Sequence, residues 1–176
     1  MTAEALDQTT RTDDRTVSAD AFRSVFRRHP AGVAVVTAAA PELVGFTATS
    51  VISVSAEPPL LVFSIDSTSS SWSALQRVDT LVVNFLTADQ VDLSARFATR
   101  GIDRFAAGGW SRLPTGEPVL DGSAGWFRGR VLERTPVGRS HLVTVLALDA
   151  AESSASGAPL VYHDRRYHAV DEHSAL

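Results

Sequence analysis

The chain has 176 residues with 16 Lys and Arg against 20 Asp and Glu, a formal net charge of −4, and no cysteine. This length suits one domain with a sizeable core, and the charge gives no bulk attraction to nucleic acid. The lack of cysteine excludes disulfides, thiolate zinc sites and a cysteine nucleophile.

The N-terminal segment, residues 1–17, is polar, and we expect it to be a flexible lead that buries too little apolar surface to fold. It has no apolar stretch of the kind found in signal peptides. No apolar run in the chain approaches the ~20 residues of a membrane helix. We therefore expect a cytoplasmic protein with no membrane partner, whose one domain covers residues 18–176.

A helix is predicted over residues 19–29, with Ser18 as its N-cap. Phe22, Val25 and Phe26 follow the i, i+3, i+4 spacing of one helix face, so we expect them to form a buried stripe.

The middle of the chain alternates predicted strands with two short helices. β-branched and apolar runs predict strands, and Pro58 and Pro59 mark a connection between two of them. Thr87 and Gln90 form a T-x-x-Q capping box before the second helix. The expected strands cover 32–38, 44–55 with a bend at Thr49 and Ser50, 60–65 and 80–86, and the expected helices cover 70–78 and 89–98.

Residues 101–122 are rich in Gly and Pro and predict one long loop, of a length that is usually functional or mobile. Strands are expected to follow over 124–134, 140–149 and 160–163, with a short edge strand over 165–170. Seven or eight strands against three short helices indicate a mainly β fold, a barrel or a sandwich.

Several familiar catalytic and binding motifs are missing from the sequence. There is no G-x-G-x-x-G, no P-loop and no G-x-S-x-G elbow, and no Ser-His-Asp combination stands out. His163, His168 and His173 recur every five residues, a spacing that shares no face of a helix or strand, so we expect no metal site.

Short hydroxyl side chains are concentrated between Gly45 and Trp72, in "GFTATSVISVSAEPPLLVFSIDSTSSSW". Small side chains let backbone N–H groups approach the edge of a flavin ring, and a serine-rich turn before a helix can form an anion-binding nest for a phosphate. The same residues also serve as ordinary turn and strand-edge residues, and composition does not separate the two interpretations.

The order of several segments extends this interpretation. From Phe22 to Val170 the chain resembles the flavin reductase-like family, the short-chain reductases of two-component monooxygenases. The resemblance is carried in family order by "FRRHPAGVAVVT", "GFTATSVISVSAEPPLLVFSI", "SSSW", "LVVNFL", "DQVDLSARFA", "DRFA", "GEPVLDG", "HLVTV" and "PLVYHDRRY". It implies an FMN-binding split β-barrel with Greek-key connections that forms a homodimer.

The resemblance also implies the binding residues. Thr47, Ala48, Thr49, Ser50 and Ser53 are expected at the flavin ring and ribityl chain, and Ser67, Ser69 and Ser70 at the phosphate, with Trp72 behind. Asn84, Arg96, Phe97, Arg104 and Phe105 complete the expected flavin site. His141 and Tyr167 are the candidates for the nicotinamide side, and His141 is the one catalytic candidate. It follows Gly138, but the Asp of the family's G-D-H motif is absent here.

The implied activity is NAD(P)H:flavin oxidoreductase, in which nicotinamide stacks on FAD or FMN and transfers hydride. The sequence shows no clear pair of Arg residues that would bind the 2′-phosphate of NADPH, which favours NADH over NADPH. Reduced flavin would diffuse to a separate monooxygenase or halogenase, and the loop around Gly108, Gly109 and Gly116 could gate exchange. The alternatives are a flavin carrier or sensor, an oxidase related to the pyridoxamine-phosphate enzymes, and a ligand-free structural barrel.

Overall fold

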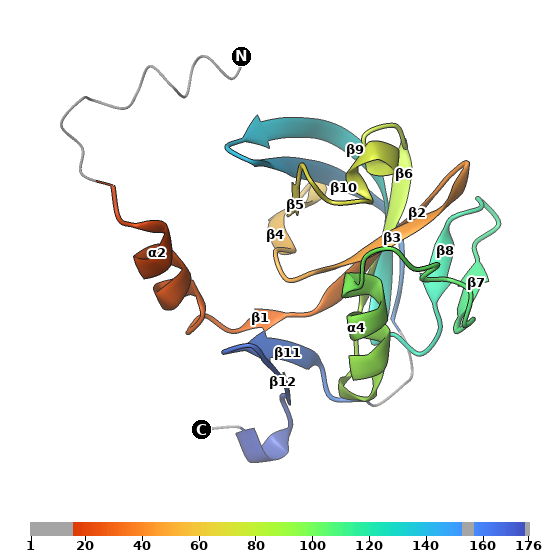
Figure 1. Cartoon of the computed structure of the whole chain (residues 1–176). Coiled ribbons are helices and arrows are strands. Elements are labelled where there is room, and N and C mark those ends of the chain that lie inside the picture. The colour runs from red at the N-terminus through yellow and green to blue at the C-terminus, as the bar shows by residue number, and fades with distance from the viewer. Residues whose placement is uncertain (1–15, 153–156, 175–176) are drawn as a thin grey trace.

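The computed structural model describes residues 16–152 and 157–174, and these form a mainly β fold with a few short helices (Figure 1). The expected mainly β, barrel-like fold is therefore confirmed. The predicted flexible lead lies outside the described residues except for residues 16 and 17. Among the described residues, no helix is long and apolar enough to span a bilayer.

One antiparallel seven-stranded sheet forms the body of the molecule. Its order is β3-β2-β6-β9-β10-β5-β4. The strands are β2 Ala34–Ala40, β3 Glu42–Ala48, β4 Ile52–Ala56, β5 Pro59–Asp66, β6 Thr80–Phe85, β9 Gly125–Val137 and β10 Ser140–Glu152.

The two edge strands of this sheet, β3 and β4, are neighbours in the chain. Only residues 49–51 connect them, so the sheet must curl until its opposite edges approach each other. Ser50 bridges this seam because its hydroxyl accepts from the Ser64 N–H of β5 at 3.0 Å and donates to the Ser64 carbonyl at 3.1 Å. The predicted bend at Thr49 and Ser50 is thus the closing point of a split barrel.

Two smaller sheets flank the barrel. One contains β1 Ala31–Gly32, β11 Leu160–His163 and β12 Arg166–Ala169, and the other is a hairpin of β7 Trp110–Arg112 and β8 Pro118–Leu120. The hairpin lies within residues 101–122, where the sequence predicted one long loop, so that prediction was wrong. Its strands are only three residues long, too short to show the alternation expected of a strand, and the segment between them contains Pro114 and Gly116.

The hydrophobic core has two parts. Side chains on the inner face of the curled sheet form the first, including Val36, Phe63, Leu81, Val83 and Val143. The second lies between the sheet, the β8 strand and α4 Val91–Ala98, and it contains Val35, Leu86, Phe97, Phe105, Leu120 and Leu160.

The helical segment that follows Thr87 begins where the sequence places its capping box. The predicted box before α4 is present: Gln90, in the 3-10 turn η1 Ala88–Gln90, accepts from the Thr87 N–H at 3.1 Å. The helix α3 covers only Trp72–Leu75, and a second 3-10 turn, η2, covers Glu172–Ser174.

The helix α2 Ala19–Phe26 departs from the prediction in one respect. Ser18 does cap it, accepting from the Ala21 N–H at 3.1 Å. However, Figure 1 shows the helix standing away from the sheet, and the expected buried stripe is exposed: Phe22 by 53%, Val25 by 71% and Phe26 by 57%. Helical spacing identifies an apolar face, but it does not identify what covers that face.

Candidate functional site

A groove of about 370 Å³ opens where the end of β3 faces the end of β5. We call it the β3–β5 groove. Its lining comes from the seam, the serine turn after β5, the end of α4 and the segment that follows, namely Phe46, Thr47, Ala48, Thr49, Ser50, Ser64, Ile65, Asp66, Ser69, Ser70, Phe97, Ala98, Arg100 and Arg104.

Half of the residues predicted to bind a cofactor line this groove. They are Thr47, Ala48, Thr49, Ser50, Ser69, Ser70, Phe97 and Arg104. The other predicted residues do not line it, and these are Ser53, Ser67, Trp72, Asn84, Arg96, Phe105, His141 and Tyr167.

Two of the predicted hydroxyl groups in the groove already have protein partners. Thr47 donates to the Ser94 carbonyl at 2.6 Å, which ties β3 to α4, and Ser50 bonds across the seam as described above. Thr49, between them, is exposed. These hydroxyls therefore fix the shape of the groove wall, while Thr49 faces solvent at its opening.

Arg104 is held at one end of the groove by four hydrogen bonds. Its guanidinium donates to the carbonyls of Thr99 and Gly45, both at 2.9 Å, and to the hydroxyls of Ser71 at 3.1 Å and Ser70 at 3.3 Å. Burial and the nearby positive charge of Arg100 lower the pKa of Arg104. Two cations that repel each other in one groove provide a favourable place for an anion.

Arg100 is a functional candidate that the sequence interpretation missed. It follows α4 by two residues, lines the same groove as Arg104 and is exposed. The sequence signal that could have identified Arg100 is the glycine that follows it. Gly101 lies between Arg100 and Arg104 and has a φ of 75°, so the chain turns back there after the end of the helix.

The serine turn after β5 has a fixed internal structure. Asp66 accepts from the Thr68 N–H and hydroxyl, both at 2.7 Å, and these bonds lower the pKa of the Asp66 carboxyl. Ser71 is fully buried and donates to the Gly45 carbonyl at 3.1 Å. The turn is thereby joined to β3 and to Arg104, and Ser69 and Ser70 are left along the groove.

His141 and Trp72 form a stacked pair outside the groove. Their ring centroids are 3.9 Å apart at an interplanar angle of 20°, and His141 Nδ1 lies 3.2 Å from the Ser67 hydroxyl. His141 pairs with Ile65 in the β10–β5 register, so it lies on the strand beside the one whose end lines the groove. Within one chain, His141 supports the serine turn.

Asn84 is fully buried and holds three strands together. Its amide donates to the Val35 carbonyl at 3.0 Å and to the Thr37 hydroxyl at 3.1 Å, and its oxygen accepts from the Leu120 N–H at 2.9 Å. These partners join β6 to β2 and β8.

The remaining predicted residues have other surroundings. Tyr167 lies 2.9 Å from the Ser94 hydroxyl and anchors β12 to α4. Arg96 donates to the Gly108 carbonyl at 3.0 Å and so ties α4 to the glycine-rich segment that could gate exchange. Ser53 lines an apolar hollow beside Ile52 and Phe127.

A second groove, of about 780 Å³, continues from the first. We call it the hairpin groove. Ser70 and Arg104 belong to both grooves, and Phe105, Trp110 and Arg112 form part of the far wall. Its other lining residues are Pro41, Glu42, Leu43, Val44, Gly45, Ser71, Ile102, Asp103 and Ala106.

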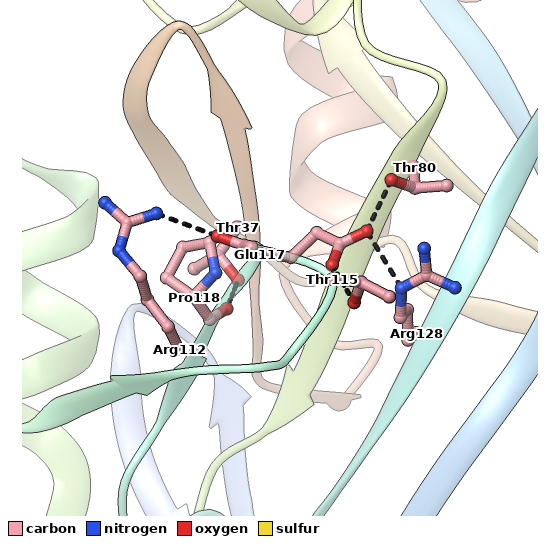
Figure 2. Close-up of polar contacts among 8 residues, drawn as sticks. Thr37, Thr80, Arg112, Thr115, Glu117, Pro118 and Arg128 are labelled. Atoms are coloured by element: carbon pink, nitrogen blue, oxygen red, sulfur yellow. Dashed lines mark hydrogen bonds and ion pairs between the residues drawn. The ribbon is translucent and has the colours of Figure 1, made fainter.

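A buried carboxylate fixes the β7–β8 hairpin to the barrel (Figure 2). Glu117, 3% exposed, accepts from Thr80, Thr115 and, at 2.8 Å, the Arg128 guanidinium. Burial raises the pKa of Glu117, but these hydrogen bonds and the Arg128 charge outweigh burial and hold the pKa below its usual value. The hairpin is therefore a rigid wall.

The chemistry of the β3–β5 groove fits a flavin nucleotide. It offers a cationic end for a phosphate, exposed backbone and hydroxyl groups along one side, and the apolar Phe46, Ala48 and Ile65 for a flat ring. Among the described residues, no three His, Asp or Glu side chains are grouped as a metal site requires.

Comparison with known proteins points the same way. The family model described as "Flavin reductase like domain" matches residues 26–171. An NADH:FMN oxidoreductase of Rhodococcus qingshengii is 46% identical over 157 residues, covering 86% of this chain and 82% of that protein.

Two solved structures share the fold. The flavin reductase domain protein of Arthrobacter sp. FB24 is 35% identical, with a TM-score of 0.83 over 88% of this chain and 96% of that one. BorF, the flavin reductase component of a bacterial two-component tryptophan halogenase, is 26% identical, with a TM-score of 0.81 over 88% of this chain and 99% of that one.

Proposed function

Since the chain belongs to the flavin reductase-like domain family, we propose that it is an NADH:flavin oxidoreductase that reduces FMN or FAD. The matched segment falls within the domain that we assign to residues 18–176. NADH as the donor is supported by the 46% identical NADH:FMN oxidoreductase.

The observation that carries this proposal is the arginine pair at one end of the β3–β5 groove. Arg104 is immobilised by four hydrogen bonds, and Arg100 faces the same space. A preorganised guanidinium binds phosphate strongly because little ordering remains to be done when the ligand arrives. Arg104 and Arg100 hold the flavin phosphate, and Ser69 and Ser70 lie beside it.

The wall between Thr47 and Ser50 orients the flavin ring. A bound flavin supplies the hydride acceptor and NADH the hydride, so the chain contributes mainly position. Thr47 and Ser50 are fixed by bonds to Ser94 and Ser64, which leaves the backbone at residues 48–50 to meet the polar edge of the ring.

The β3–β5 groove is an open hollow rather than a sealed cavity, and Thr49, Ser70 and Arg100 along it are all exposed. Such a site permits the flavin to leave after reduction. The partner is accordingly a separate flavin-dependent monooxygenase or halogenase that takes up the diffusing reduced flavin, as the role of BorF in a two-component halogenase supports.

We propose that the working form of the protein is a homodimer, and the exposed apolar side chains support this proposal. Two elements expose large apolar side chains: α2 exposes Phe22, Val25 and Phe26, and β4 exposes Ile52 by 58% and Val54 by 55%. A monomer that leaves this much apolar surface in water is expected to bury it against another chain. Phe26 and Ile52 line one hollow together with Thr49 and Ser50, so a second copy bound to this apolar face would lie beside the β3–β5 groove. A cytoplasmic location suits this chemistry.

The dimer is tested with the double variant Phe22→Ser, Phe26→Ser. Light scattering coupled to size exclusion should give the mass of two chains for the wild type and of one chain for the variant. Monomeric wild-type protein would contradict the homodimer.

Activity is tested by mixing the purified protein with FMN or FAD and following NADH absorbance. Turnover is expected with at least one flavin. Arg104→Gln should raise the KM for FMN by about tenfold, because one charge-assisted bond to phosphate is lost. The exposed Arg130→Gln on β9 is the matched control and should behave as wild type. Flavin that binds but is not reduced by either nicotinamide donor would indicate a carrier instead.

A further inference from the structure

The serine turn after β5 begins with an acidic residue, Asp66, in a groove that is otherwise cationic. Asp66 is the last residue of β5, is exposed, and lines the β3–β5 groove together with Arg100 and Arg104. Among the described residues that line this groove, Asp66 carries the only negative charge. A carboxylate therefore lies in the groove that the proposed function assigns to a phosphate.

Asp66 is close to the position proposed for that phosphate. Its carbonyl accepts from the Ser69 N–H at 2.9 Å, which closes a four-residue turn. Such a turn brings its first and last Cα atoms within about 7 Å of each other. Ser69 and Ser70 lie beside the phosphate in the proposed function. The carboxylate is thus within about one Debye length of it, about 10 Å at 0.1 M salt, so the two anions repel each other.

The carboxylate of Asp66 is held by the turn itself and not by an arginine. The Thr68 hydroxyl and N–H both donate to Asp66 Oδ1 at 2.7 Å. These bonds hold the pKa of Asp66 below its usual value, and the charges of Arg139 and Arg100 lower it further. Among the described residues, neither arginine forms an ion pair with Asp66. Asp66 therefore keeps its negative charge without a direct cationic partner.

We propose that Asp66 limits the affinity of the β3–β5 groove for the flavin phosphate and thereby speeds the release of reduced flavin. This inference rests on the proposed function, in which the reduced flavin leaves by diffusion. Arg104 and Arg100 attract the phosphate, and Asp66 opposes them. A like charge beside a bound anion weakens binding, and changes of affinity at one site appear mainly in the dissociation rate.

The variant Asp66→Asn separates the charge from the structure of the turn. It removes the negative charge, while the amide oxygen can still accept from the Thr68 N–H and hydroxyl. Asp149→Asn on β10 is the matched control. Asp149 is exposed, accepts from the Ala150 N–H at 2.8 Å and lines neither groove. Both variants change the net charge of the chain by the same amount.

The probes are FMN and riboflavin, which share the ring and the ribityl chain and differ in the phosphate. Fluorescence titration should show that Asp66→Asn lowers the Kd for FMN by about threefold to fivefold, the effect of one exposed charge pair. The Kd for riboflavin should stay within about twofold, which also shows that the variant is folded. Asp149→Asn should change neither Kd.

Salt and kinetics give two further readouts that a purely structural role would not change. The gain in FMN affinity should become smaller as salt rises to about 1 M, where the Debye length falls to about 3 Å. In stopped-flow fluorescence, FMN should dissociate from Asp66→Asn more slowly than from the wild type, by a factor close to the change in Kd.

Equal changes in Kd for FMN and riboflavin would overturn the inference, because they would leave Asp66 with a structural role in the turn alone. Unchanged or weaker binding of FMN by Asp66→Asn would overturn it as well, and so would a wild type that binds neither flavin. The reductase activity is judged separately. A wild type that binds FMN without oxidising NADH would contradict the proposed function, and the comparison of FMN with riboflavin would still decide the effect of Asp66 on affinity.

Discussion

Replacing Asn84 by alanine separates a structural role from a binding role at a residue that the family resemblance assigns to the flavin site. The amide of Asn84 contacts the Val35 carbonyl, the Thr37 hydroxyl and the Leu120 N–H, and no part of it is exposed. We therefore expect Asn84→Ala to lower stability and to leave flavin binding by the folded protein unchanged.

The size of the effect follows from these three contacts. Each lost hydrogen bond costs about 1 kcal/mol net, so the free energy of unfolding should fall by roughly 3 kcal/mol, with the stranded Leu120 N–H as the largest part. In a domain of this size about 1 kcal/mol shifts Tm by roughly 2–4 °C, so a fall of about 6–12 °C is expected.

Thermal unfolding followed by circular dichroism measures this shift, and fluorescence titration with FMN at a temperature where the variant is folded measures binding. Thr37→Val is the companion variant, because the Thr37 hydroxyl also donates to the Pro118 carbonyl at 2.5 Å. A double-mutant cycle should give a coupling of about 0.5 kcal/mol or more between the two sites. An unchanged Tm together with a tenfold loss of FMN affinity would refute the structural role.

Two further changes test the barrel and its carboxylate. The folded pKa of Glu117 lies below its unfolded value, so its contribution to stability is complete above about pH 4.3 and is lost as the pH falls through the folded pKa. Glu117→Gln should lower the free energy of unfolding by about 3 kcal/mol at pH 7, because Arg128 is left without its partner. The difference in unfolding free energy between variant and wild type should become smaller below pH 4. A difference that does not change with pH in urea titrations would contradict this. In Gly45→Ala the new Cβ would lie 2.6 Å from Phe97 Cε1, and this overpacking should lower the free energy of unfolding by about 1–3 kcal/mol, measured as a lower Tm. Gly32→Ala is the control, because its Cβ would meet nothing within 4 Å and its Tm should equal that of the wild type.

The sequence predicts elements well where one local rule decides them. The Ser18 cap, the Thr87–Gln90 box and the strand Leu160–His163 are confirmed because each depends on neighbouring residues alone. The apolar face of α2 was predicted to be buried and is exposed, because its cover is not supplied by any described part of the same chain.

The candidate site likewise contains residues that the sequence could predict and residues that it could not. The resemblance assigns Thr47 to Ser50 and Arg104 to flavin binding, which stays a prediction, and the structure places these residues along one groove. The stacking of His141 on Trp72 and the burial of Asn84 depend on contacts between distant strands, which no local pattern encodes. Arg100 was missed because an exposed arginine after a helix resembles any solvated surface residue.

The connection at residues 49–51 joins the two edges of the sheet and also lines the β3–β5 groove. An inserted or deleted residue there would change the circumference of the barrel and the width of the groove in a single step. Changes of length are therefore better tolerated at exposed turns that line neither groove. Relatives that accept a different ligand should keep this connection at its present length and vary the side chains along it.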